Sequence, residues 1–413
     1  MTETSAPSPD PADLMPPPIP VVPPPYHSPE RERLQAQARR FAAERVLPVA
    51  NELDPVKGEI PRWLLEEMAA EGYFGITVPT EHGGLGLGAF EYCMVAEELA
   101  RAWMSVASII ARAQGAGTGV ADEARRHELL RRSARGEWIG AIALSEPDAG
   151  SDLAGVATRA ERDGDAFVLT GRKRWTGNAK AADFIQVLVR TADPGPDERR
   201  SAGLATLLVE KQRDSFPEGL TGRPIDKIGY HGFVTWDLEF DGLRVPVANQ
   251  LGGENADEGA FASTQQWLNI ARVHTAARAV GLARAAVEDS IVYLQERRQF
   301  EHPIGDFQAV RFKLATMAAR VEQARAFYQH VAHLIDLGQP CEREAAMVKL
   351  LATEMAAEVT GDGIQLHGGN GYTTEHRVER HWRDARLTTI FEGTSEIQMK
   401  IVADRLLPRS PLG

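Results

Sequence analysis

The spacing of hydrophobic and polar residues changes twice along the chain. Between Pro29 and about Arg135, apolar residues recur every three to four positions, as in "RERLQAQARRFAAERVLPVANELD", and this period predicts helices. From about Glu137 to Val247, short runs rich in β-branched and aromatic residues, such as "FIQVLVRT", are separated by Gly, Pro, Asn and Asp. Because no helical segment lies between these runs, they predict an antiparallel sheet or a small barrel.

Helical spacing returns after about Asp257. Long Ala-rich helices are predicted over 258–298, 306–337 and 342–366, with a shorter helix around 377–384 and another after Glu392. Helices of such lengths suit an antiparallel bundle. In the first third, "AFEYCMVAEELARAWMSVASIIARA" is largely apolar and is predicted to be one long buried helix.

This order of patterns predicts an α+β multidomain protein with a β-domain between two helical domains. The predicted ranges are 1–28 for a Pro-rich tail, 29–136 for an N-terminal helical domain, 137–250 for the middle β-domain and 251–413 for a C-terminal helical bundle domain. The tail sequence "PPPIPVVPPPY" excludes helix and central strand, because proline lacks the N–H donor and fixes φ. It predicts a disordered or polyproline-II segment, either a solvated extension or a PxxP ligand.

The net charge and the number of cysteines argue against several classes of binding partner and site. The net charge of -12 argues against a nucleic acid or an anionic membrane as partner, since both favour a basic face. Two cysteines, Cys93 and Cys341, make neither a disulfide framework nor a four-ligand metal site, so no metal is expected and a reducing, cytoplasmic compartment fits best. No run approaches the 18 or so apolar residues of a membrane span, and the N-terminus lacks the charged start of a signal peptide.

Four glycine-bearing segments are candidate ligand contacts, and each also has a plainer interpretation. "ALSEPDAGSDLAG" (143–155) offers backbone N–H groups to a polar ligand or is an ordinary loop. "RKRWTGNAKAAD" (172–183) places Trp175 at a strand end, where its ring suits either a flat cofactor or the core. "ERRQFEHPIGDFQ" (296–308) sets cations at a helix end, for a ligand or for capping. "IQLHGGNGYTTEHRVERHWRDA" (364–385) contains a Gly turn that admits a ligand or ends a helix.

One acid near the C-terminus is a candidate general base. Glu392 lies between Ile390-Phe391 and Gly393-Thr394 in "LTTIFEGTSEIQM", with no basic neighbour in sequence. Thr394 is predicted to cap a last helix. Glu392 is therefore either an acid stabilised by the dipole of that helix, or a desolvated carboxyl whose pKa is raised towards the range of a general base.

In their order, these segments resemble the acyl-CoA dehydrogenase family of FAD-dependent flavoenzymes over roughly residues 30–408. "ALSEPDAGSDLAG" and "QLHGGNGYTTEHRVERHWRDARLTTIFEGTSEIQ" are similar to two family signatures, and "GITVPTEHGGLGLG", "LRVPVANQLGG" and "RRQFEHPIGDFQ" to the blocks between them. The resemblance implies an N-terminal helical domain, a middle β-domain and a C-terminal four-helix bundle. It also implies FAD, a homotetramer built from dimers, and α,β-dehydrogenation of an acyl-CoA thioester in fatty acid metabolism such as β-oxidation. The electrons would pass to an electron-transfer flavoprotein.

The resemblance also implies roles for individual residues. Glu392 would take the α-proton while the β-hydrogen leaves as hydride to the flavin, and no cation is expected beside Glu392, because a cation would weaken the base. The implied FAD contacts are Leu144, Ser145, Trp175, Thr176, Gly177, Arg297, Gln299, Phe300, Gln365, His367, Gly368, Gly369, Thr394 and Glu396. Those at 297–300 and 365–369 would reach FAD across a subunit interface. The implied substrate contacts are Ser151, Arg272, Phe391 and Gly393.

Some positions depart from the family pattern. Thr176-Gly177 stand where the family usually has Ile or Cys followed by a Thr or Ser whose hydroxyl bonds flavin N5. Either Thr176 replaces that hydroxyl, or N5 lacks the bond, which would favour an acyl-CoA oxidase that reduces O2 to peroxide. Glu301 stands where glycine is usual, so the local turn is in question. Ala271 occupies the position of an alternative base, which leaves Glu392 as the candidate.

The acyl group itself is not readable from the sequence. The segment "SVASIIARAQGAGTG" is expected to form the base of the acyl pocket. Arg112 within it either meets a polar end of the acyl group or, as we favour from the sequence, faces solvent or pairs with an acid. A flavin-binding protein without dehydrogenase activity is a further alternative, against which Glu392 and the acidic charge argue.

Overall fold

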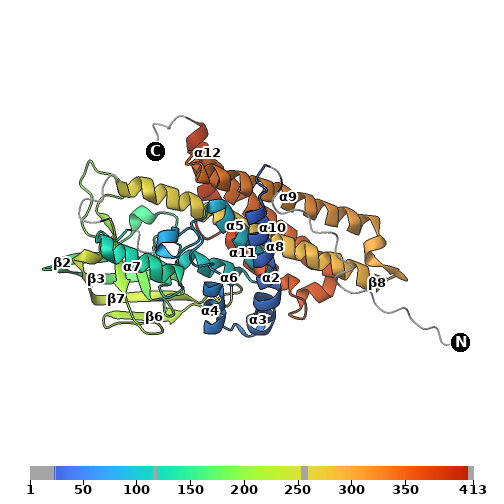
Figure 1. The fold of residues 1–413 in the computed structure, drawn as a ribbon, viewed down its shortest axis with the longest axis horizontal. Helices are drawn as coiled ribbons and strands as arrows, with labels where there is room; N and C mark the ends of the chain where they lie inside the picture. Colours follow the sequence, from blue (N-terminus) through green and yellow to red (C-terminus); the bar gives the residue numbers. More distant parts are fainter. Residues whose placement is uncertain (1–22, 24, 115–118, 253–258, 408–413) are drawn as a thin grey trace.

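The computed structural model describes residues 23, 25–114, 119–252 and 259–407 (Figure 1). The predictions for the Pro-rich tail fall almost entirely on residues outside these ranges. The larger strands gather at one end of the molecule, and long helices extend from there to the opposite end (Figure 1). Among the described residues, no helix combines the length and the apolar character that crossing a bilayer requires.

The N-terminal domain is helical, as predicted. Its α-helices are α2 (Pro29–Phe41), α3 (Leu47–Leu53), α4 (Arg62–Ala70), α5 (Ala89–Ala102), α6 (Met104–Ile109) and α7 (Glu123–Ala134), with a π-helical turn at Ala42–Val46. The predicted single helix from 89 to 113 is wrong, because Trp103 adopts extended backbone (φ −160°, ψ 113°) and separates α5 from α6. The buried indole of Trp103 packs where a Cβ on Gly232 would overlap it. The break thus lets the indole contact the β-domain.

The middle domain is one mixed sheet rather than a purely antiparallel one. Its strands are β1 (Gly140–Ala143), β2 (Arg159–Asp163), β3 (Ala166–Gly177), β4 (Phe184–Arg190), β5 (Leu204–Glu210), β6 (Leu220–Pro224) and β7 (Thr235–Pro246). They run in the order β1-β4-β2-β3-β7-β6, with β5 also on β4. The pairings of β4 with β1 and with β2 are parallel, and the remaining pairings are antiparallel. The long β3–β7 pair is irregular between Lys173 and Thr176, where Trp175 has a φ of 66°.

The C-terminal domain consists of long helices whose bounds lie within a few residues of the prediction. They are α8 (Gly259–Glu296), α9 (Gln308–Asp336), α10 (Glu342–His367), α11 (Val378–Thr388) and α12 (Ser395–Leu406), with the hairpin strands β8 (Arg298–Gln299) and β9 (His302–Pro303). Short 3₁₀ turns lie at Asp54–Val56, Thr80–His82, Ile110–Arg112, Leu153–Gly155, Val247–Asn249, Ile304–Asp306 and Gly368–Tyr372. With 38 residues, α8 is about 57 Å long at 1.5 Å per residue. It packs against α5, α9, α10 and α11.

The β-domain is held to the helical bundle through the loop between β6 and β7. The Tyr230 N–H donates to Asp384 Oδ1 of α11 at 2.5 Å. On the same helix, Arg383 Nη2 donates to Asp54 Oδ1 of the N-terminal domain at 2.6 Å. Burial, helped by the nearby Asp54 charge, raises the pKa of Asp384 to about 6. One turn of α11 therefore joins all three domains through buried charges.

Candidate functional site

Glu392 lies in a tight turn between α11 and α12. Both Glu392 and Gly393 have left-handed backbone, with φ values of 54° and 90°. The carbonyl oxygen of Gly393 accepts hydrogen bonds from Lys349 Nζ at 2.6 Å and from Gln398 Nε2 at 3.0 Å. Thr394 caps α12, as predicted, because its side chain accepts the N–H of Ile397. These contacts fix the backbone of the turn and thereby the direction of the Glu392 side chain.

The carboxylate of Glu392 is paired with a buried arginine on α8. Arg278 Nη2 donates to Glu392 Oε1 at 2.8 Å, and the Thr275 hydroxyl donates to the other carboxylate oxygen. The expectation that no cation stands beside Glu392 is therefore wrong. Thr275 and Arg278 are three residues apart, so they are neighbours on one face of α8. That spacing was the available signal in the sequence for this contact.

The arginine also reverses the expected pKa shift of the base. Desolvation alone raises the pKa of Glu392, but the Arg278 charge and the hydrogen bond from Thr275 outweigh it and lower the pKa below its ordinary value. The side chain is 28% exposed, and the Arg278 side chain is only 2% exposed. The Glu392 carboxylate is thus held in its ionised form by Arg278 and Thr275.

Aromatic rings and a second arginine surround this pair. The Arg278 guanidinium lies 4.9 Å from the centre of the Phe391 ring. Arg112 lies 5.5 Å from the centre of the Phe233 ring, and its charge also lowers the pKa of Glu392. Arg112 is half-buried and makes no ion pair within the described ranges, so of the two alternatives that we favoured from the sequence, pairing with an acid is not seen.

The loop after β1 brings the predicted flavin contacts Leu144 and Ser145 beside the end of β3. Lys173 Nζ donates to the Leu144 carbonyl at 2.9 Å and to Glu146 Oε1 at 2.8 Å. The Arg174 N–H donates to the Ser145 carbonyl at 2.8 Å. Ser151 is exposed farther along the same loop. Next to these residues the side chain of Trp175 is 55% exposed, so an open aromatic face adjoins the loop.

Thr176 and Gly177 are both buried, unlike Trp175. The Thr176 hydroxyl has no hydrogen-bond partner among the described residues and is closed off from solvent. A Cβ on Gly177 would overlap the Phe233 ring, so Phe233 fills the space that a larger residue would need. A ligand bound against Trp175 therefore reaches the Thr176 hydroxyl only if the irregular segment of β3 moves.

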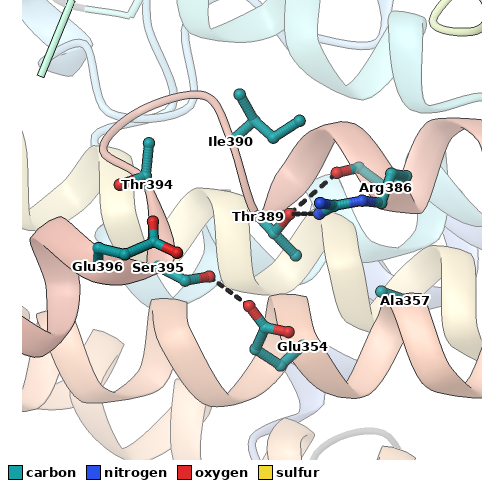
Figure 2. A pocket seen from close by; sticks show the side chains of 8 residues that line it. All are labelled: Glu354, Ala357, Arg386, Thr389, Ile390, Thr394, Ser395 and Glu396. Atoms are coloured by element: carbon teal, nitrogen blue, oxygen red, sulfur yellow. Dashed lines mark hydrogen bonds between the residues drawn. The ribbon is translucent and has the colours of Figure 1, made fainter.

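A pocket of about 450 Å³ opens on the other side of the Glu392 turn, at the start of α12 (Figure 2). Its lining includes the predicted Thr394 and Glu396 and residues that sequence reasoning missed, namely Glu354, Ala357, Arg386, Thr389, Ile390 and Ser395. In Figure 2, Arg386 is hydrogen-bonded to Thr389, and Ser395 to Glu354. Arg386 and the helix N-terminus favour an anionic group such as a phosphate, whereas the carboxylates of Glu354 and Glu396 in the same lining suit hydroxyl groups.

The remaining predicted residues lie together at the far end of α8. Arg297, Gln299 and Phe300 are in the exposed hairpin of β8 and β9, and Gln365, His367, Gly368 and Gly369 end α10. Tyr293 joins the two groups, because its hydroxyl donates to the His367 carbonyl at 3.2 Å and its ring stacks on His367 at 4.2 Å. From Thr275 to Arg297 is about 33 Å along the helix, so one chain does not bring this cluster to its own Glu392.

The chemistry of these residues suits FAD. The open indole of Trp175 suits a flat ring, and the pocket at α12 suits a nucleotide part. At the far end, a Cβ on Gly368 or Gly369 would meet no atom within 4 Å, so the backbone there is open to a ligand. The helix–sheet–helix architecture and this site define a flavoprotein oxidoreductase.

Comparisons with known proteins give the family. Family models match for the acyl-CoA dehydrogenase N-terminal domain at residues 28–137, the middle domain at 141–243 and the C-terminal domain at 257–407. The chain is 39% identical to benzylmalonyl-CoA dehydrogenase of Aromatoleum aromaticum, covering 91% of this chain and 97% of that protein. It is 38% identical to (2S)-methylsuccinyl-CoA dehydrogenase of Cereibacter sphaeroides, covering 92% and 70%.

A solved structure described as an electron transferring flavoprotein of Acidaminococcus fermentans superposes with a TM-score of 0.85 at 31% identity, covering 93% of this chain and 99% of that chain. The chain therefore belongs to the acyl-CoA dehydrogenase family, whose members depend on FAD.

Proposed function

We propose that the protein oxidises an acyl-CoA thioester to the trans-2-enoyl-CoA, with Glu392 as the base that removes the α-proton. The observation that carries this proposal is the turn at Glu392, where Lys349 and Thr394 fix the backbone so that the carboxylate projects towards α8. FAD, when bound, supplies the acceptor for the hydride that leaves the β-carbon. Family membership supports acyl-CoA dehydrogenation in general, and the assignment of Glu392 is the finer step.

The other side chains act by orientation. Arg272 lies three residues before Thr275 on α8, where it donates to Asn269 Oδ1 at 3.0 Å, and its cation is proposed to meet the CoA portion of the substrate. Gly393 lets the Gln398 amide pack against the turn, because a Cβ there would overlap Gln398 Nε2, and the Phe391 ring adds an apolar wall that limits water near the reacting carbons. Ser151, exposed on the loop after β1, is proposed to contact the acyl-CoA.

We infer that the working unit is a homo-oligomer in which one chain completes the flavin site of another. The cluster of Arg297, Gln299 and Phe300 lies about 33 Å from Thr275 along α8, so it can serve only a neighbouring copy. In the single chain, Phe300 and Tyr372 at this end are each 85% exposed, as expected for rings that a second chain covers. A tetramer built from such dimers is part of the proposal.

The electron acceptor is proposed to be an electron-transfer flavoprotein. Similarity to a solved structure described as an electron transferring flavoprotein supports this acceptor. The observation that favours an oxidase instead is Gly177, which carries no hydroxyl for flavin N5, while the Thr176 hydroxyl is closed off. Rapid peroxide release in air without another acceptor would establish the oxidase activity; slow release together with rapid reduction of the flavoprotein would exclude it. A cytoplasmic location remains a prediction.

The base assignment is tested by anaerobic flavin reduction with a panel of straight, branched and carboxylated acyl-CoAs. Glu392→Gln keeps the shape of the side chain and removes its basicity, so the reduction rate should fall by at least about 10³-fold while FAD stays bound. The matched control is Asp404→Asn, because Asp404 is an exposed acid on α12 that pairs with Lys400 at 2.7 Å, so this variant should retain rapid reduction. Rapid reduction by the Glu392→Gln protein would refute the assignment.

A further inference from the structure

The buried guanidinium of Arg278 has no role in the dehydrogenation described above. Its Nη1 donates to Ser108 of α6 at 2.7 Å, and its Nη2 donates to Glu392 Oε1 at 2.8 Å and to the Thr275 hydroxyl at 2.9 Å. Its Nε has no partner among the described residues, although the side chain is 2% exposed. Arg278 therefore connects Glu392, the proposed proton acceptor, to α6, which belongs to the segment expected to form the floor of the acyl pocket.

Positive charge exceeds negative charge around the base. Arg278 and Arg112 face a single carboxylate, Glu392, and no other acid pairs with either guanidinium in the described ranges. His274 next to them is fully buried, and burial together with Arg278 lowers its pKa, so it stays neutral. The Nε2 atom of His274 and the Nε atom of Arg112 also lack partners among the described residues. The free Nε donors of Arg112 and Arg278 thus give this cluster unused hydrogen-bonding capacity that suits an anion, whereas neutral His274 adds no charge to it.

Arg278 brings its hydrogen-bond donors close to the carbon atoms of the substrate that react. A base that removes a proton from carbon stands about 3–3.5 Å from that carbon. Because Arg278 Nη2 is 2.8 Å from the Glu392 carboxylate, its guanidinium must lie within about 6 Å of the substrate α-carbon. A purely alkyl substrate would leave Arg278 either holding the base or buried without an anion, and both outcomes are unfavourable.

We propose that the substrate is the CoA thioester of a dicarboxylic acid whose free carboxylate is attached to the β-carbon, and that this carboxylate takes Arg278 from Glu392. The substrate carboxylate would accept hydrogen bonds from Arg278 and Arg112, and Glu392 would be released to act as the base. A carboxylate on the β-carbon places its oxygens about 3.5 Å from the α-carbon, within the reach derived above. This inference rests on the proposed dehydrogenation and names its substrate class.

The test compares two substrates that differ only at the β-substituent. 2-Methylsuccinyl-CoA carries a carboxylate where 2-methylbutyryl-CoA carries a methyl group. With the full-length FAD-bound protein under anaerobic conditions, we expect the kcat/KM for flavin reduction to be at least about 100-fold higher for 2-methylsuccinyl-CoA. Glutaryl-CoA, with its carboxylate one carbon farther away, should be at least about 10-fold poorer than 2-methylsuccinyl-CoA.

Variants of Arg278 separate recognition from stability. Arg278→Gln should reduce the ratio of the two kcat/KM values by at least about 100-fold, and Arg278→Lys should retain part of the ratio because it keeps the charge. The matched control is Arg284→Gln, since Arg284 is also buried on α8 and paired with glutamates, at 2.8 Å from Glu98, but away from Glu392. This control should lower the melting temperature and leave the substrate ratio unchanged.

The outcomes distinguish the two levels of the proposal. Equal or faster reduction by 2-methylbutyryl-CoA in the wild-type protein would overturn the substrate class and leave the dehydrogenase function standing. A substrate ratio that survives Arg278→Gln would overturn the role of Arg278. If no acyl-CoA of any kind reduced the flavin, the proposed function itself would fail, and the inference with it. The wild-type ratio decides the substrate class even if an Arg278 variant does not fold.

Discussion

Lys349 is predicted to position the Glu392 side chain indirectly, by fixing the backbone of the turn that carries it. Its ammonium group is fully buried and donates to the Gly393 carbonyl at 2.6 Å. Left-handed backbone at Glu392 costs about 1–2 kcal/mol, because the residue has a Cβ. The turn therefore needs a contact that stabilises it by a similar free energy. Lys349→Met removes that contact while keeping most of the side-chain volume.

The free energy lost in Lys349→Met depends on the contacts that the Gly393 carbonyl keeps. A hydrogen bond from a charged donor contributes about 1.5–3 kcal/mol. Gln398 Nε2 still donates to the same carbonyl at 3.0 Å, which prevents an unsatisfied oxygen and brings the expected loss to about 1–2 kcal/mol. If this energy is lost from the orientation of Glu392, flavin reduction should slow by about 5–30-fold, with a smaller change in substrate affinity.

The assay is stopped-flow flavin reduction at saturating acyl-CoA, compared with the melting temperature. Lys400→Met is the control, because Lys400 pairs with Asp404 at 2.7 Å on the exposed side of α12 and should affect neither quantity by much. Burial lowers the pKa of Lys349 to about 8, so the charged form of the donor is lost above that pH. The wild-type rate should therefore decline above about pH 8, and the Lys349→Met rate should not. A lower melting temperature with an unchanged reduction rate and pH profile would refute the positioning role.

Three further predictions concern stability and are checked by thermal unfolding. Glu301→Gly should stabilise the β8–β9 hairpin by about 1 kcal/mol, because Glu301 has a φ of 69° in a turn that favours glycine; a fall in melting temperature would contradict this. Lys173→Met should lower the free energy of unfolding by about 3–5 kcal/mol, because it leaves the buried Glu146 carboxylate without its cation. Adding Glu146→Leu should restore part of this free energy, and no recovery in the double variant would argue against a charge effect. Asp384→Asn should change the pH dependence of stability: because the folded-state pKa of Asp384 is raised to about 6, its contribution to wild-type stability falls as pH rises from about 4 to 6, so the difference in stability between wild type and variant should change over this range; parallel curves would contradict the assignment.

The sequence predicted the local elements well where one physical signal dominated. The long helices α8, α9 and α10 follow from uninterrupted Ala-rich periodicity, and Thr394 was identified as a cap because its hydroxyl precedes the last helix. The sequences of strands β2 and β6, "RAERD" and "LTGRP", are polar and lack the apolar alternation by which a strand is predicted. Their place in the sheet comes from pairing with β3 and β7.

Other departures arise from contacts between distant segments. Trp103 breaks a helix that its neighbours favour, since its indole packs against Gly232 of the β-domain. Glu301 adopts backbone that glycine would adopt more easily, because the two-residue connection between β8 and β9 requires positive φ at both positions. In each case a tertiary requirement outweighs a local preference of about 1 kcal/mol.

The pair of Arg278 and Glu392 shows why the sign of a pKa shift is harder to predict than burial. An acid between apolar residues near a helix start was identified as a candidate base, and desolvation by itself does raise its pKa. The countercharge, however, comes from a residue 114 positions away, and it reverses the direction of the shift. Basicity at Glu392 therefore depends on what binds Arg278. An anionic substrate would raise the pKa of the base on arrival, so that proton abstraction is favoured only when the correct acyl group is in place. If Arg278 holds the Glu392 carboxylate until a substrate carboxylate replaces it, binding of the correct substrate also activates the base. A carboxyl group that was simply buried, with no cation beside it, could not link substrate recognition to basicity in this way.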